Sequence, residues 1–240
     1  NQIPQPTLED QAERTERKPM GKAERWAFFR QFRLGFIMLL VAYFFVTAYR
    51  DYRDNYMPEI LSGLGYNKES VGSLLSTTEL WVGFGVLGTL SLLFLVRIHR
   101  WGVIGAYSIM IFGCLLLGGG TWMFRQGAIG GEAWIIATGL GGYLTYVPFG
   151  SVLFDRLIAA THVVATAVYA IYFADATGYL GSILVQIYKD FYASDSSRVD
   201  FFVQFNYVMT FTGVVLLCAS LVYFLGKIDR GGKDGASGSA

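Results

Sequence analysis

The chain has 240 residues, of which 53% are hydrophobic and only 15% are charged, and its net charge is +1. An ordinary soluble domain carries about 25% charged residues, so this composition argues against a soluble protein. The basic residues flank apolar stretches and form no stripe, which argues against nucleic-acid binding. Cys114 and Cys218 each lie inside an apolar stretch, without the spacing of a metal or redox motif.

Residues 1–33 precede the first long apolar stretch and are predicted to form a cytoplasmic linker. Residues 1–21 are polar with mixed charges, which is typical of a flexible segment. In Lys22–Arg33, basic side chains alternate with Trp26 and three phenylalanines. This pattern is typical of a short helix on the membrane surface, and a plain basic flank with aromatic belt residues explains it equally well. Because the chain begins with Asn1, we expect it to be processed or to be part of a longer protein.

Six apolar stretches follow. A helix needs about 20 mostly apolar residues to cross a bilayer; five stretches reach this length, and Leu34–Tyr49 is charge-free and continues into a charged outer turn. Because the loops between them are short, consecutive helices are expected to be antiparallel neighbours. The predicted fold class is an all-α membrane protein, a six-transmembrane-helix bundle over residues 34–226. The Gly/Ser-rich residues 227–240 are predicted to be a flexible cytoplasmic tail. The predicted spans are Leu34–Tyr49, Val71–Val96, Trp101–Phe124, Ala133–Phe154, Leu157–Tyr188 and Phe201–Gly226.

The distribution of lysine and arginine predicts the orientation of the bundle. Six spans place both termini on one side, and most of the lysines and arginines lie on that side, many of them in residues 1–33. The positive-inside rule then places both termini in the cytoplasm.

Charges inside the spans are the strongest functional signal, because a charge at mid-bilayer costs at least about 2.5–3.5 kcal/mol. Arg50 lies 16 residues past Leu34, about 24 Å along the helix and still within the outer hydrocarbon region. Arg50 and Asp54 are expected to pair at i,i+4. Arg50 and Arg53 share a side of the helix, where two guanidinium groups can bind a carboxylate or phosphate. The alternative is a water-exposed helix end whose charges anchor the topology.

Two carboxylates interrupt later spans. Glu79 lies about two turns inside the second span, where it either carries a proton or forms a salt bridge with Arg50 or Arg53. Asp175 lies near the middle of the fifth span and is the deepest carboxylate, so it marks a pathway or forms a buried structural pair.

The candidate site residues are polar side chains inside these spans. Asp155 and Arg156, at the inner end of the fourth span, are expected to form a structural charge pair that braces a cytoplasmic turn. No metal-ligand spacing, nucleophile elbow or phosphate-binding glycine loop is found, so we expect no metal, no cofactor and no enzyme. The predicted substrate or ion pathway comprises Arg50, Asp51, Arg53, Asp54, Glu79, Tyr146, Tyr172, Asp175 and Tyr179.

Six spans, a charged linker and a basic turn from Arg97 to Gly102 (RIHRWG) resemble one half of a major facilitator superfamily transporter. The turn has arginines and a glycine like the superfamily motif but lacks its aspartate. Residues 34–226, through AYRDYRDNY, TTEL, GYLTYVPFGSVLFDRLIAA and YFADATGYLGSILVQIYKDF, look like the C-terminal half of an uncharacterised bacterial family related to that superfamily. The first span, followed by Met57 and Pro58, is also similar to sugar-phosphate and glycerol-phosphate antiporters, in which Arg50 would by position bind phosphate.

These resemblances imply a multi-pass protein of the bacterial cytoplasmic (inner) membrane. They imply half of an alternating-access transporter for a small polar or anionic solute, with proton coupling as an option. The expected partners are the lipid bilayer and an N-terminal six-helix half, a second copy or other membrane subunits. The alternative is a non-transporting accessory subunit of a larger membrane complex.

Overall fold

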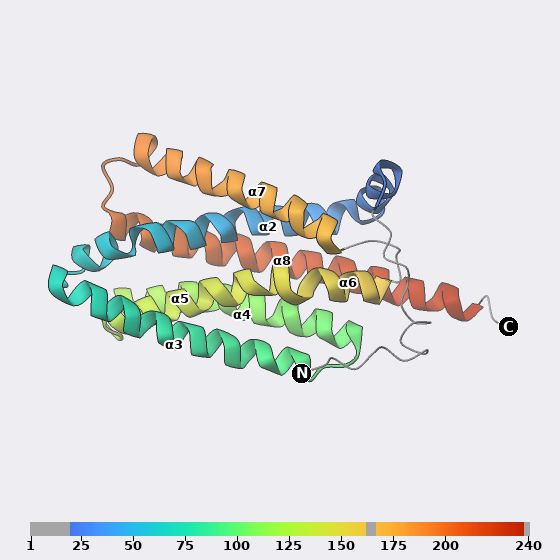
Figure 1. Ribbon diagram of the computed structural model, residues 1–240, viewed down its shortest axis with the longest axis horizontal. Coiled ribbons are helices and arrows are strands. Elements are labelled where there is room, and N and C mark those ends of the chain that lie inside the picture. Colours follow the sequence, from blue (N-terminus) through green and yellow to red (C-terminus); the bar gives the residue numbers. More distant parts are fainter. Residues whose placement is uncertain (1–19, 162–166, 238–240) are drawn as a thin grey trace, which may run out of the picture.

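The computed structural model describes residues 20–161 and 167–237, and the side chains of these ranges up to residue 229. The described residues form helices joined by short turns (Figure 1). Six of the helical segments are long and apolar enough to cross a membrane, which confirms the all-α class and the number of spans for the described part of the chain. The elements are α2 (Lys22–Gly63), α3 (Lys68–Phe94), α4 (His99–Arg125), α5 (Gly131–Pro148), η1 (Phe149–Leu153), α6 (Phe154–Thr161), α7 (Ala167–Ile187), η2 (Tyr188–Tyr192) and α8 (Arg198–Ser237).

The long helices lie roughly parallel in one bundle, with α3 and α7 at opposite edges of the view (Figure 1). Helix α2 packs against α7, α8 and α5, while α4 packs against α5 and α8. Helix α3 contacts mainly α5. Helix α2 has the largest share of buried residues among the spans, whereas α3, α7 and α8 have the smallest shares.

Aromatic stacking and small residues hold the helices together. Trp134 of α5 stacks on Phe124 of α4 with ring centroids 4.4 Å apart, and its indole N–H donates to Thr121 at 3.0 Å. A Cβ at Gly181 of α7 would overlap the backbone carbonyl of Phe44 in α2. Small residues allow such close approach between membrane helices, where packing rather than water exclusion drives association.

The segment from Lys22 onward is helical and continuous with the first span. The backbone bends at Phe32 (φ −112°, ψ 15°), and the first turns of α2 point away from the bundle axis (Figure 1). Phe28 and Phe32 are buried against the bundle, whereas the Trp26 side chain is 62% exposed. Residues 22–33 are therefore helical and continue directly into the first span, while residues 1–19 of the predicted linker lie outside the described residues.

The boundary between the fourth and fifth spans differs from the prediction. Helices α5, η1 and α6 form one continuous span to Thr161, so Leu157 belongs to the fourth helix and not to the fifth. Pro148 lacks a backbone N–H, and the helix widens to π geometry in η1 directly after it and continues beyond.

This longer helix also corrects the expected pair of Asp155 and Arg156. Both residues lie inside α6. The Arg156 guanidinium instead donates to the backbone carbonyl of Arg97 at 3.4 Å. Among the described residues, no ion pair joins Asp155 to Arg156.

The last helix is also longer than predicted, because α8 continues past Gly226 to Ser237. Residues 227–237, expected to be part of a flexible tail, are therefore helical. An ion pair between Arg100 Nε and Asp229 Oδ1, 3.2 Å apart, joins this extension to the start of α4.

Candidate functional site

Helix α2 carries a stripe of polar side chains along its length. We call this stripe, together with the side chains of other helices that contact it, the polar face. Residues 43, 47, 50 and 54 repeat every three or four positions and so lie on one side of the helix, whereas residues 51, 53 and 55 flank that side. Neighbouring helices contribute Glu79 from α3, Tyr143 and Tyr146 from α5, and Asp175 and Ser182 from α7. The α2 members are Tyr43, Thr47, Arg50, Asp51, Arg53, Asp54 and Asn55.

Arg53 forms the most enclosed ion pair of the polar face. Its side chain is only 2% exposed, and its Nη2 lies 2.7 Å from Glu79 Oε1. Its Nη1 lies 3.5 Å from Asp54 Oδ1. Gly139 of α5 makes room for the guanidinium, because a Cβ there would overlap it. The structure thus forms the salt bridge that was one of the two possibilities for Glu79, and this pair ties α2 to α3.

Arg50 points to a different partner from the one predicted. Its guanidinium pairs with Asp51 and lies over the Tyr146 ring, 4.2 Å from the centroid. The expected i,i+4 pair with Asp54 is wrong, because Asp54 instead accepts a hydrogen bond from Tyr143 and lies near Arg53.

The proposed two-arginine clamp for an anion is not formed either. The two guanidinium groups engage different helices, Arg50 toward α5 and Arg53 toward α3, and each pairs with a carboxylate. An anion would therefore have to displace existing partners.

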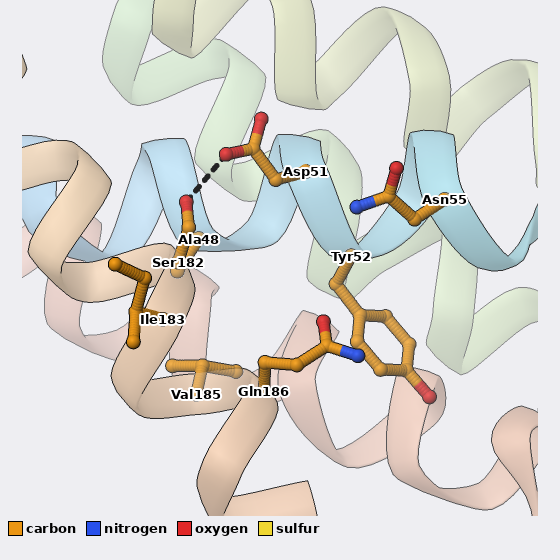
Figure 2. Close-up of a pocket in the computed structure, with 8 residues that line it drawn as sticks. All are labelled: Ala48, Asp51, Tyr52, Asn55, Ser182, Ile183, Val185 and Gln186. Carbon is orange, nitrogen blue, oxygen red and sulfur yellow. Dashed lines mark hydrogen bonds between the residues drawn. The ribbon is translucent and has the colours of Figure 1, made fainter.

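Asp51 extends the polar face to α7. One carboxylate oxygen pairs with Arg50, and the other accepts a hydrogen bond from the Ser182 hydroxyl (Figure 2). Beside this contact a pocket of about 220 Å³ opens between α2 and α7. The pocket is lined by Ala48, Asp51, Tyr52, Asn55, Ser182, Ile183, Val185 and Gln186.

Asp175 meets the polar face through Tyr43. The Tyr43 hydroxyl donates to Asp175 Oδ1 at 2.7 Å, and the Tyr43 ring stacks on Tyr146 at a centroid distance of 5.6 Å. Among the described residues, no lysine or arginine lies within ion-pair distance of Asp175. A chain of contacts therefore runs from Asp175 through Tyr43 and Tyr146 to Arg50.

Two of the predicted tyrosines are not brought into this network. The side chains of Tyr172 and Tyr179 are 70% and 60% exposed. They stand at helical spacing from Asp175, yet neither makes a polar contact with any residue that the structure describes.

Sequence reasoning missed Tyr43, Tyr143, Asn55, Ser182 and Gln186. A signal existed for the first two, because Tyr43 lies seven residues before Arg50 and Tyr143 lies three before Tyr146, both helical repeats. The α7 residues gave no such signal, because the pairing of α7 with α2 is a tertiary feature.

The fold and the polar face together define a class: a multi-pass helical membrane protein with ion pairs and tyrosines along one central helix. Residues 1–227 match a family of unknown function (DUF5690), and the chain belongs to this family. Comparison with curated proteins gave no match. Comparison with solved structures also gave no match.

Proposed function

We propose that the chain is one six-helix half of a transporter similar to the major facilitator superfamily, located in a bacterial cytoplasmic membrane. It would move a small polar solute by alternating access, with the polar face of α2 lining the path. The proposal rests on one observation: charged side chains lie within the membrane-spanning helices and remain partly exposed.

The exposure of these charges limits what can cover them. The side chains of Asp54 and Glu79 are each 40% exposed, and those of Arg50 and Asp51 are 20% and 24% exposed. Charges in a spanning segment normally face water or protein, because contact with lipid is costly. A water-filled path, bounded on its other side by a second set of helices, meets this requirement.

The pairing pattern narrows the class of solute. Both arginines of the polar face are already paired with carboxylates, so neither supplies a free positive charge. Of the two expected kinds of solute, this favours a polar solute over an anionic one. It also weakens the role of Arg50 that the phosphate antiporters implied.

Asp175 is our candidate for the coupling proton. It accepts a hydrogen bond from Tyr43 and has no cationic partner among the described residues. A carboxylate in such a place can alternate between a charged and a protonated state, as proton relays in membrane transporters do.

Uptake into proteoliposomes tests the proposal. Labelled glycerol and glucose are supplied as probes with and without an inward proton gradient. We expect uptake by the wild type, loss of uptake in Arg50→Gln and Asp175→Asn, and no loss in Gln126→Leu, which alters an exposed residue at the end of α4. Unchanged uptake in both charge variants, with normal insertion, contradicts the site assignment.

A second function, that of an accessory subunit, draws on the exposed surface of α7 and η2. Tyr172, Tyr179 and Phe191 expose 70%, 60% and 77% of their side chains, and a partner subunit would cover such a surface. This reading predicts a stable complex in native mass spectrometry after mild extraction, together with no uptake of any probe.

A further inference from the structure

The pocket between α2 and α7 has the lining of a small ligand site. In Figure 2 the side chains of Asp51 and Asn55 extend from α2 and that of Gln186 extends from α7 around one space. Aliphatic side chains, among them Ala48 and Ile183, complete the lining. Its volume of about 220 Å³ falls below the roughly 300–1,000 Å³ of pockets for drug-sized ligands. A ligand that fits is therefore small.

The charges around the pocket are balanced. The two carboxylate oxygens of Asp51 are engaged, one by Arg50 and the other by Ser182. A cationic ligand would have to compete with Arg50 for this carboxylate, and an anionic ligand would lie against it. Because an unpaired charge away from bulk water is costly, the lining favours an uncharged ligand.

The two amides supply the hydrogen-bonding capacity of the pocket. Asn55 makes no hydrogen bond with any described residue, and Gln186 makes only a long contact of 3.4 Å to Asp190. Each amide carries two N–H donors and one carbonyl acceptor, so the pair can both donate hydrogen bonds to hydroxyl groups and accept hydrogen bonds from them. The aliphatic side chains beside them suit the C–H surface of the same ligand.

We propose that this pocket binds a small uncharged polyhydroxylated solute of the size of a polyol or monosaccharide. The inference deepens the proposed function by naming the solute class, and its transport role rests on that function. The hydroxyl-rich headgroup of a glycolipid carries the same chemistry as a free polyol, so both sources must be distinguished.

Equilibrium binding to the purified full chain in nanodiscs tests the pocket without any transport step. The probes are glycerol, sorbitol and glucose, with choline and inorganic phosphate as charged comparators, and binding is measured by isothermal titration calorimetry. The variants Asn55→Leu and Gln186→Leu remove the amides at positions that are not buried. Gln126→Leu makes the same change away from the pocket.

We expect at least one polyol or glucose to bind the wild type and Gln126→Leu equally. Each pocket variant should weaken binding about tenfold, the effect of one lost hydrogen bond. Competition with glucose by nanodiscs that contain a glucosyl lipid, but not by those with phosphatidylcholine alone, identifies the headgroup as a source and supports the same chemistry.

Three results would overturn the proposal: no binding of any of the three polyhydroxylated probes, equal binding by the pocket variants, or binding of choline or phosphate that depends on Asn55 and Gln186. The outcome is separable from that of the proposed function. Binding without uptake refutes the transport proposal but supports the binding pocket. Uptake that is unchanged in both leucine variants refutes the binding pocket but supports the transport proposal.

Discussion

Loss of Glu79 should destabilise the protein more than loss of a surface carboxylate on the same helix. In Glu79→Leu, Arg53 Nη2 loses its acceptor at 2.7 Å while the side chain stays almost fully enclosed, at 2% exposure. Removing one partner of a buried pair costs about 3–5 kcal/mol. Asp54, 3.5 Å from Nη1, still offsets part of the charge, so we expect a loss of about 3 kcal/mol.

The double variant Arg53→Met/Glu79→Leu separates the pair from simple truncation. Replacing both charges by apolar side chains removes the uncompensated charge, and such replacements are often neutral or stabilising. We therefore expect the double variant to recover about 2 kcal/mol or more relative to Glu79→Leu. Glu69→Leu, an exposed acid in the first turn of α3, serves as control and should cost about 0.5 kcal/mol.

Equilibrium unfolding in mixed dodecylmaltoside and sodium dodecylsulfate micelles, followed by tryptophan fluorescence, measures these differences. Arg53→Met is measured alone as well. If the effects of Arg53→Met and Glu79→Leu add up in the double variant, Arg53 and Glu79 are not coupled and the reasoning is refuted. A Glu79→Leu variant as stable as Glu69→Leu would refute it as well.

Two further predictions concern the interface of α2 with α7. Tyr43→Phe removes the hydrogen bond to Asp175 and should lower the free energy of unfolding by about 1 kcal/mol, while reducing proton-driven uptake; equal stability and uptake would contradict the contact. Gly181→Ala places a methyl group against the Phe44 carbonyl and should cost about 1–3 kcal/mol in the same unfolding assay. Gly119→Ala, which meets open space, is the control and should not destabilise.

The spans were predictable because their signal is local. Length and apolarity are read directly along the chain, and each expected stretch corresponds to one of the six long helices, although several helix ends differ. One error arose at the inner end of the fourth span, which was expected to end at Phe154 but continues to Thr161. Asp155 and Arg156 indicated a cytoplasmic turn there, but both residues lie inside α6.

The charged members of the polar face were predictable, and the salt bridge of Glu79 was one of the expected alternatives, but the partners of Arg50 and Asp54 were not predicted. Helical spacing correctly placed Arg50 and Asp54 on one side of α2, but it offered only partners within that helix. In the structure, Tyr143 of α5 donates a hydrogen bond to Asp54, and Arg50 pairs with Asp51 instead. Contacts between helices distant in sequence decide such choices, and spacing along one helix carries no information about them.

The pairing in turn changes what the charges can do. As isolated residues, two arginines at membrane depth predict an anion site. They share the polar face with four carboxylates, of which Asp51, Asp54 and Glu79 pair with an arginine and Asp175 does not, so the carboxylates outnumber the arginines. An anion approaching this face gains no free guanidinium and meets excess negative charge. The arginines therefore hold carboxylates in place, and the amides of Asn55 and Gln186 are the groups that can still form hydrogen bonds with a ligand.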